Sequence, residues 1–365
     1  MDAGLARTEN PGAGATGTRL PVIVHRGTTL PPPAQAQPVP LVIALHPSGG
    51  TPAGFETATG LDAVADQHGF VVAYLAAPAP TSPAWTLTDM PANLAYVSSE
   101  INQLTADQNI DPNRVYVTGF SAGASMSFFV GCQLSGQVAA IAVVSGWMRV
   151  DDPCQLAHPV SELNIVGTKD GQPLGGTARL MSVEAVATRW RLMDSCTSQS
   201  SSAPSGPVTE TTWSSCNDSS GVGLNVIEGG THQWPGAPQA TGADTQYNAA
   251  QIVWAFFAAH PGTPTTSVSA KFSSLTVGHF RLKRWVRATL SVGEQPVTLR
   301  MTLSGHGRLV ASKPFLLARS PQDLVVFPLP VNLSGGRYSL KLSLADSYAR
   351  RMTVVRTVTV PKQPH

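Results

Sequence analysis

Short apolar runs alternate with stretches of helical periodicity over residues 19–262. Continuous apolar runs that end at turn signals are typical of strands buried on both faces of a sheet. These runs are Leu20–His25, Leu41–Leu45, Val71–Leu75, Val115–Thr118, Ala139–Val144, Leu163–Val166 and Leu224–Ile227. Helical patterns lie between them at Ala92–Gln108 and after Ser121, and Asp244–Ala259 is predicted to be a closing helix. The alternation predicts an α/β fold: a mostly parallel sheet with helices on both faces.

The pattern changes near residue 262. The stretch PGTPTTSV at residues 261–268 has the composition of a linker. After it, only short alternating runs such as VTLRMTLSG and YSLKLSLA occur, separated by turn signals such as SGHG. Short strands at regular spacing predict a β-sandwich of immunoglobulin-like type. The expected organisation is a flexible N-terminal segment at 1–18, an α/β domain at 19–262, a linker at 263–268 and a β-sandwich at 269–365.

Composition narrows the class of protein. The chain has 365 residues, which favours two domains, and its apolar content of 42% is enough for a large core. Charged residues make up 13% and the net charge is +2, and no basic stripe with interleaved aromatics is present. The sequence therefore predicts neither a disordered chain nor a nucleic-acid partner. No apolar stretch is long enough to span a bilayer, and we expect a monomer that needs no cofactor.

The cysteines and the N-terminus bear on the compartment. The four cysteines, Cys132, Cys154, Cys196 and Cys216, form no C-x-x-C pair, and their spacing fits no zinc site. Two disulfides are favoured over four buried free thiols, which predicts an oxidising compartment. Residues 1–19 contain no apolar run and do not form a signal peptide as they stand. The sequence is therefore interpreted as the mature form of a secreted chain.

The strongest chemical signal is the motif Gly119-Phe120-Ser121-Ala122-Gly123. It follows the strand pattern RVYVT and precedes the helical pattern ASMSFFVG, which is the context of a nucleophile elbow. There the serine lies on a tight strand-to-helix turn, and the N-terminus of the helix offers free N–H groups to a developing oxyanion. The alternative is an ordinary Gly/Ser turn.

A serine nucleophile needs a base, and the base needs an orienting carboxylate. In a fold with this elbow the chain order is serine, acid, histidine. The stretch LNIVGTKDG supplies Asp170 just past the strand Leu163–Val166. Its alternative interpretation is a solvated loop aspartate. The stretch LNVIEGGTHQWPG then places His232 just after the last predicted strand and after the acid.

The oxyanion would need a second backbone donor from an early loop. His46-Pro47-Ser48-Gly49-Gly50 follows the strand Leu41–Leu45. Because Pro47 has no N–H, Ser48 is the better donor, paired with the N–H of Ala122. We expect His46 to organise this loop by hydrogen bonding.

Together these motifs resemble the secreted esterases grouped with polyhydroxybutyrate depolymerases and feruloyl esterases. The matching segments are LHPSGG, DPNRVYVTGFSAG, VGTKDG and EGGTHQWPG, within residues 19–260. The resemblance implies an α/β-hydrolase fold, a triad of Ser121, Asp170 and His232, and oxyanion donors at Ser48 and Ala122. It also implies the disulfides Cys132–Cys154 and Cys196–Cys216. The sequence departs from the family at Pro47, where glycine is usual, and the C-terminal β domain lies outside the resemblance.

The substrate is less well defined by the sequence. Trp85, Phe120, Trp147 and Trp234 lie near strand ends or motifs and could form an apolar platform for an acyl group, or simply pack the core. The resemblance implies a serine esterase acting on polyhydroxyalkanoate, feruloyl or aromatic polyester substrates. A peptidase on the same fold, and a surface-binding protein with a vestigial hydrolase domain, are the alternatives. The C-terminal domain either attaches the enzyme to an insoluble polymer or only stabilises the hydrolase.

Overall fold

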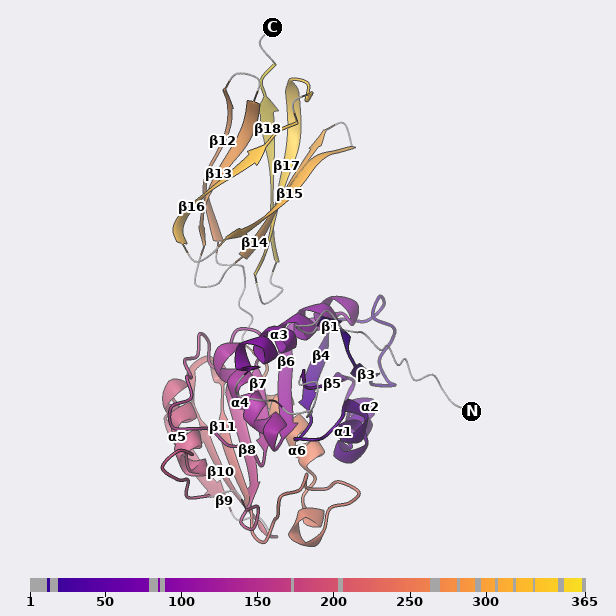
Figure 1. Cartoon of the computed structure of the whole chain (residues 1–365), viewed down its shortest axis with the longest axis vertical. Helices are drawn as coiled ribbons and strands as arrows, with labels where there is room; N and C mark the ends of the chain where they lie inside the picture. Colours follow the sequence, from indigo (N-terminus) through magenta and orange to yellow (C-terminus); the bar gives the residue numbers. More distant parts are fainter. Residues whose placement is uncertain are drawn as a thin grey trace, which may run out of the picture. The chain divides into compact units, whose positions relative to one another are not determined.

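The computed structural model describes most of the chain in two compact units, residues 1–263 and 264–365 (Figure 1). The described residues are 12–13, 19–78, 85, 89–171, 174–202, 206–262, 270–280, 283–292, 297–305, 308–317, 320–330, 332–346 and 351–362. The linker predicted at 263–268 lies outside them, as does the N-terminal segment predicted at 1–18 apart from Gly12–Ala13. Each unit has its own hydrophobic core.

The first unit combines one large sheet with six α-helices among the described residues. Its strands are β1 (Gly12–Ala13), β2 (Arg19–Leu20), β3 (Val22–Arg26), β4 (Val39–Leu45), β5 (Val71–Leu75), β6 (Ile110–Phe120), β7 (Ala140–Val144), β8 (Ser161–Gly167), β9 (Ser198–Ser202), β10 (Val208–Ser214) and β11 (Val222–Ile227). Its helices are α1 (Pro52–Thr59), α2 (Leu61–His68), α3 (Met90–Asp107), α4 (Ala122–Gln133), α5 (Val183–Met193) and α6 (Ala249–Ala259), with 3-10 turns η2 (Asn217–Ser219) and η3 (Gly242–Gln246).

The large sheet has nine strands in the order β3-β5-β4-β6-β7-β8-β11-β10-β9. The six strands from β5 to β11 run parallel to one another, whereas β3, β10 and β9 pair antiparallel at the two edges. The predicted mostly parallel sheet is therefore present. Because the parallel strands share one direction, the loops after β4, β6, β8 and β11 all leave from the same edge of the sheet.

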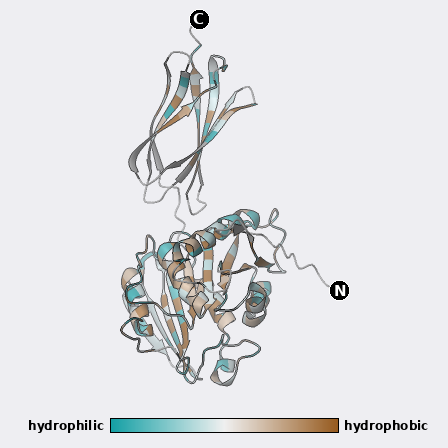
Figure 2. Cartoon of the chain, in the orientation of Figure 1, coloured by the Kyte–Doolittle hydropathy of each residue, from teal (hydrophilic) through white to brown (hydrophobic). Residues whose placement is uncertain are grey.

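Helices cover both faces of this sheet, and strand β4 shows why its residues are apolar throughout. Leu41, Ile43 and Leu45 belong to the core formed with α3, α4 and α5. Val42 and Ala44 alternate with them and belong to the core formed with α1, α2 and α6. Successive strand residues point to opposite faces, so a strand buried on both sides must be apolar at every position. Figure 2 shows this hydrophobic colouring along the central strands.

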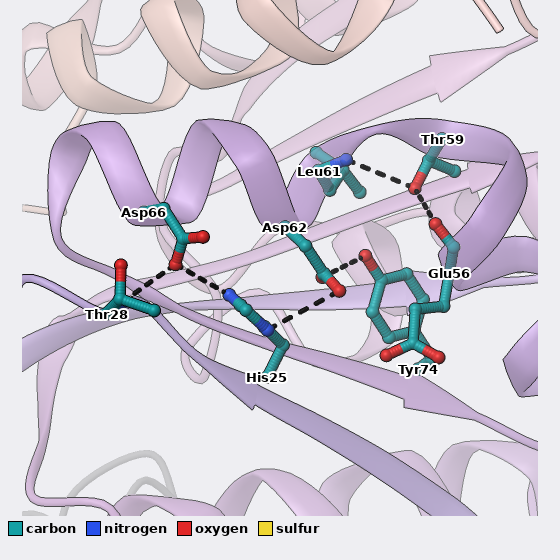
Figure 3. A network of polar contacts seen from close by, with 8 residues as sticks. All are labelled: His25, Thr28, Glu56, Thr59, Leu61, Asp62, Asp66 and Tyr74. Carbon is teal, nitrogen blue, oxygen red and sulfur yellow. Dashed lines mark hydrogen bonds and ion pairs between the residues drawn. The ribbon is translucent and has the colours of Figure 1, made fainter. Parts of the chain in front are cut away.

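A polar network fixes helix α2 against the edge strand β3 (Figure 3). His25 of β3 lies between two carboxylates of α2, with Nδ1 3.5 Å from Asp62 Oδ2 and Nε2 2.9 Å from Asp66 Oδ1. Tyr74 of β5 donates its hydroxyl to Asp62 Oδ1 at 2.7 Å. These contacts connect α2 to β3 and β5. Helix α1 directly precedes α2 in the chain, so they also help to place α1, which lies beside the candidate site.

The second unit consists of two antiparallel sheets. One has the order β12-β13-β16 and the other the order β15-β14-β17-β18. Their bounds are β12 (Ala270–Phe280), β13 (Lys283–Val292), β14 (Val297–Gly305), β15 (Arg308–Leu317), β16 (Ser320–Pro328), β17 (Gly336–Asp346) and β18 (Arg351–Val360). Buried residues from both sheets, including Val286, Phe327, Met301 and Leu342, share one core. Alternation of buried and exposed positions along the strands is what the sequence pattern predicted for this region.

Two parts of the first unit differ from the sequence-based expectation. The closing helix begins at Ala249 rather than Asp244, because the Asn248 side chain caps it by accepting from the Gln251 N–H at 3.1 Å. Asp244 instead lies in the 3-10 turn η3. Strands β9 and β10 form a hairpin at the sheet edge where the sequence shows a Ser/Thr-rich stretch.

Among the described residues, no helix is long and apolar enough to cross a membrane.

Candidate active site

Ser121 occupies a strained turn between β6, which ends at Phe120, and α4, which begins at Ala122. Its φ of 56° and ψ of −116° are unusual for a residue with a side chain. The turn is closely packed: a Cβ on Gly123 would lie 2.0 Å from the Leu45 carbonyl oxygen, and one on Gly119 would lie 2.4 Å from Gly123. Only glycine therefore fits at positions 119 and 123, two residues before and after the serine. This geometry matches the elbow expected from the motif.

The three residues of the expected triad meet above the carboxyl ends of the parallel strands. Ser121 follows β6, Asp170 follows β8 and His232 follows β11. His232 Nε2 lies 3.0 Å from Ser121 Oγ, and His232 Nδ1 lies 2.7 Å from Asp170 Oδ1. Both distances are those of hydrogen bonds. The imidazole thus connects a hydroxyl to a carboxylate in the arrangement that nucleophilic catalysis by serine needs.

The contact with Asp170 favours one tautomer of His232. Carboxylate oxygens are acceptors, so this contact favours a proton on Nδ1 and leaves Nε2 as the acceptor that faces Ser121 Oγ. The Asp170 side chain is fully buried, whereas the His232 side chain is 36% exposed. Asp170 Oδ2 is buried and has no hydrogen-bond partner among the described residues. The imidazole is therefore the polar group on which this carboxylate acts.

The loop after β4 packs against the start of α4. His46 is buried, its Nδ1 lies 2.8 Å from the Pro47 carbonyl oxygen, and its Nε2 accepts from the Ala77 N–H at 3.0 Å. Burial lowers the pKa of His46, which favours the neutral ring that these two contacts require. His46 thus organises the loop by hydrogen bonding, as expected. Ser48, at the tip of this loop, is exposed.

Ala122 is the first residue of helix α4, and the Ser121 N–H is already bonded to the Val144 carbonyl oxygen at 3.0 Å. The N–H groups of a first helical turn have no partner within the helix. The Ala122 N–H is therefore available next to the serine. The close approach of Gly123 to the carbonyl groups of Leu45 and His46 brings the loop that contains Ser48 to the same end of the helix.

A cavity of about 400 Å³ opens beside His232. Its lining residues are largely apolar and include three aromatic side chains, Phe55, Phe120 and Trp234. The full lining is Pro47, Gly50, Thr51, Gly54, Phe55, Ala58, Phe120, His232, Gln233, Trp234, Ala237 and Gln239. No Asp, Glu, Lys or Arg is found among these described lining residues, so the cavity suits an uncharged group.

The four aromatic residues singled out from the sequence have different surroundings. Phe120 and Trp234 line the cavity, and the Phe120 ring centroid lies 4.9 Å from that of His232. Trp85 is buried and donates its Nε1–H to the His46 carbonyl oxygen at 3.0 Å, so it braces the loop after β4. Trp147 is half-buried, its N–H donates to Ser125 Oγ at 3.1 Å, and it does not line this cavity.

Helix α1 forms one wall of the cavity, and this wall was not predicted from the sequence. Phe55 packs edge-on against Trp234 with centroids 5.5 Å apart, and Trp234 Nε1 donates to the Thr59 carbonyl oxygen at 3.1 Å. A signal for this helix is present, since Thr51 is an N-cap that accepts from the Gly54 N–H and Pro52 follows it at the first helical position. Pro47, the departure from the family pattern, also lines the cavity.

The four cysteines form two disulfides in the pairs that the resemblance implied. Cys132–Cys154 connects helix α4 to the segment after β7. Cys196–Cys216 closes the segment that contains the hairpin of β9 and β10. The structure contains no free cysteine among the described residues.

Comparison with known proteins supports the resemblance inferred from the motifs. Residues 25–157 match the family model "Esterase PHB depolymerase", a segment that includes Ser121 but ends before Asp170 and His232. The chain is 29% identical over 217 residues to feruloyl esterase B of Piromyces equi, covering 53% of this chain and 39% of that protein. It is 30% identical over 148 residues to the putative esterase NocK of Nocardia uniformis subsp. tsuyamanensis, covering 38% of this chain and 42% of that protein. The chain thus spans about two-fifths of these relatives' lengths.

A solved structure supports the fold. The chain is similar to Thermogutta terrifontis esterase 2 phosphonylated by cyclosarin, with a TM-score of 0.50 and 11% sequence identity. The similarity covers 69% of this chain and 94% of that chain. At this identity the likeness concerns the fold alone. The first unit therefore has the α/β-hydrolase fold that the motifs implied.

Proposed function

We propose that this chain is a serine carboxylic-ester hydrolase that works through an acyl-enzyme, with Ser121 as nucleophile, His232 as general base and Asp170 as the orienting acid. The observation that carries this proposal is the continuous hydrogen-bonded series from Ser121 Oγ through His232 to Asp170, with distances of 3.0 and 2.7 Å. The family match and the esterase relatives support the same reaction class.

Acylation begins when Ser121 Oγ attacks the carbonyl carbon of the ester. The hydroxyl proton passes to His232 Nε2, which faces it, while Asp170 stabilises the imidazolium that forms. The carbonyl oxygen becomes an oxyanion and accepts hydrogen bonds from the N–H groups of Ala122 and Ser48, which we propose as donors. The tetrahedral intermediate collapses, the ester C–O bond breaks, and His232 returns its proton to the leaving alcohol.

Deacylation repeats these steps with water as the nucleophile. His232 Nε2 takes a proton from the water as its oxygen attacks the acyl carbon, and the second tetrahedral intermediate then releases Ser121 Oγ, which regains a proton from His232. The products are the carboxylic acid and the free enzyme. The His232 side chain is 36% exposed, so water can reach the imidazole.

The cavity indicates the kind of ester. Its lining is mostly aromatic and aliphatic, and the described lining residues include no Asp, Glu, Lys or Arg. Such a lining fits an uncharged apolar acyl or alcohol group. Esters of polyhydroxyalkanoate, feruloyl or aromatic polyester type meet this requirement. We assign Phe120 and Trp234 to substrate binding, since both line the cavity. Substrate-binding roles for Trp85 and Trp147 stay predictions without support from this cavity, because neither lines it and Trp85 braces the His46 loop.

The second unit is proposed to be an immunoglobulin-like β-sandwich, with domain boundaries at 269 and 365 after a linker at 263–268. Its seven described strands, divided three and four between two antiparallel sheets around one core, support this interpretation. On strand β13, the Arg287 guanidinium lies 5.4 Å from the Trp285 ring centroid. Such a pair can offer both charge and apolar surface to an insoluble polymer.

An extracellular location is proposed from the disulfides. Two disulfide bonds and no free thiol among the described residues fit an oxidising compartment.

A substrate panel tests the proposed function. We expect the purified chain to hydrolyse a short-chain nitrophenyl ester and at least one of methyl ferulate, a polyhydroxybutyrate film or an aromatic polyester. Ser121→Ala should lower turnover by roughly 10⁶-fold, as removal of a triad nucleophile typically does. Circular dichroism of both proteins controls for folding. Absence of turnover on every ester, or an active Ser121→Ala variant, would overturn the proposal.

A further inference from the structure

Asp244 makes a close contact with the residue that precedes His232. Asp244 lies in the 3-10 turn η3 and is 1% exposed. Its Oδ2 accepts two hydrogen bonds from Thr231, from the backbone N–H at 2.9 Å and from the Oγ1 hydroxyl at 2.9 Å. Its carbonyl oxygen accepts from the Gly236 N–H at 2.8 Å. One buried residue thus holds the loop on both sides of His232.

The same loop is bound to the loop that carries the acid. The Lys169 N–H donates to the Gly230 carbonyl oxygen at 2.7 Å, and the Gly229 N–H donates to Thr168 Oγ1 at 2.8 Å. Packing between them is tight, because a Cβ on Gly167 would lie 2.2 Å from the Gly230 carbonyl carbon. The backbone before Thr231 is therefore fixed relative to the strand end that leads to Asp170.

Asp244 completes this framework from the other side. A Cβ on Gly230 would lie 3.0 Å from Asp244 Oδ1, so Gly230 is enclosed between Gly167 and Asp244. Asp244 Oδ1 is buried and has no hydrogen-bond partner among the described residues. Burial removes water from both side-chain oxygens of Asp244, and only Oδ2 gains hydrogen bonds from the protein in return. Both hydrogen bonds from Thr231 end on Oδ2, so this one oxygen carries the side-chain contact to the loop.

We propose that Asp244 is a positioning residue for His232, a proposal that rests on the proposed function of the Ser121 site. By holding both donors of Thr231, Asp244 sets the backbone at His232 so that the imidazole reaches Asp170 and Ser121 together. Asp244 acts through Thr231 and is assigned no contact with substrate. Loss of this contact lets the imidazole leave its position between carboxylate and hydroxyl, which slows proton transfer, while the cavity walls formed by helix α1 and Phe120 stay in place.

The test compares steady-state kinetics on a soluble nitrophenyl ester for Asp244→Ala, Asp244→Asn and Thr231→Val. We expect Asp244→Ala to lower kcat about 10²-fold with little change in KM, the scale of loss for a displacement of about 1 Å. Asp244→Asn should recover most of this loss, because its amide oxygen still accepts from Thr231. Thr231→Val, which removes the hydroxyl and keeps the N–H, should lie between them.

Ser161→Ala is the matched structural control. Ser161 is 2% exposed and accepts from the Gly221 N–H at 3.1 Å, at the opposite end of β8 from the site. We expect it to lower the thermal midpoint and leave kcat unchanged. If Asp244→Ala folds and keeps the wild-type kcat, the positioning role is wrong. It is also wrong if Ser161→Ala lowers kcat as much as Asp244→Ala does when both lower the thermal midpoint by the same amount. Should Asp244→Ala fail to fold, an unchanged kcat in Thr231→Val overturns the proposal by itself.

A double variant separates this proposal from the proposed function. If Asp244 acts through His232, adding Asp244→Ala to His232→Ala should not lower the residual rate further, since coupled residues are not additive. Multiplicative losses would show an independent role and contradict the positioning proposal. Unchanged hydrolysis in His232→Ala alone would instead mean that the base assignment, and with it the proposed function, is wrong.

Discussion

The carboxylate of Asp170 lies 2.7 Å from Nδ1 of His232, although 62 positions separate the two residues in the chain. Strands β8 and β11 are parallel neighbours in the sheet, so the loops that follow them leave the sheet side by side. The contact is a direct result of this strand order. It also predicts how the site responds when the carboxylate is neutralised.

Asp170→Asn should lower kcat by roughly 10⁴-fold while leaving the fold unchanged, because an amide can favour the wrong imidazole tautomer without moving the ring. The measurement is steady-state hydrolysis of a soluble nitrophenyl ester. Asp151→Asn is the control, since Asp151 is exposed and has the same side chain. A variant at Asp170 that kept a tenth of the wild-type rate would exclude this aspartate as the acid.

Much of this site follows from sequence order and strand ends. The elbow around Ser121 and the loops of Asp170 and His232 could be predicted because each motif directly follows an apolar strand, and parallel strands bring such loops to one edge. The cavity wall that contains Phe55 could not be predicted, since its position depends on which face of the sheet helix α1 covers. Asp244 was interpreted as part of the closing helix, because the sequence does not show that Asn248 caps that helix instead. The hairpin of β9 and β10 was missed because its outer strand Ser198–Ser202 is exposed and shows no apolar alternation.

Gly123→Ala should abolish ester turnover and destabilise the fold. A Cβ at this position would lie 2.0 Å from the Leu45 carbonyl oxygen, so β4 and α4 would have to separate at the nucleophile. Gly175→Ala is the matched control, because nothing lies within 4 Å of a Cβ there. Thermal unfolding and ester turnover are measured for both. Normal activity in Gly123→Ala would contradict the packing described for the elbow.

Stability should fall as pH rises from about 4 towards 7. Burial raises the pKa of Asp194 to about 7, and it raises that of the fully buried Glu162 as well. Between the ordinary aspartate pKa of about 3.9 and the raised pKa of Asp194, the folded state binds the proton that the unfolded state has lost. Each such group therefore removes about 1.4 kcal/mol of stability per pH unit in this range.

Asp194→Asn should flatten this dependence. Urea unfolding at pH 5 and pH 7 measures the decrease in the free energy of unfolding for wild type and variant, and the decrease should be smaller in the variant. Asp151→Asn, an exposed carboxylate, should keep the wild-type decrease. Equal decreases in wild type and Asp194→Asn would show that Asp194 is already ionised at pH 5 in the folded protein.

A chain truncated after residue 262 should retain hydrolysis of a soluble ester and lose turnover on a polymer film. The reason is that, among the described residues, each unit has hydrophobic clusters of its own. The measurement compares nitrophenyl ester and film hydrolysis for full-length and truncated proteins. Equal loss of both activities, or unfolding of the truncated chain, would make the second unit a structural partner rather than an attachment domain.

Covalent labelling of Ser121 tests the central claim most directly. An activated serine attacks the phosphorus of diethyl 4-nitrophenyl phosphate, forms an Oγ–P bond and releases nitrophenolate, and the strained turn and His232 are what would activate Ser121. We predict one nitrophenolate released per chain, a diethylphosphoryl adduct on the peptide that contains Ser121, and no release from Ser121→Ala. An adduct on a different residue, or undiminished labelling of Ser121→Ala, would contradict the assignment of Ser121 as the nucleophile.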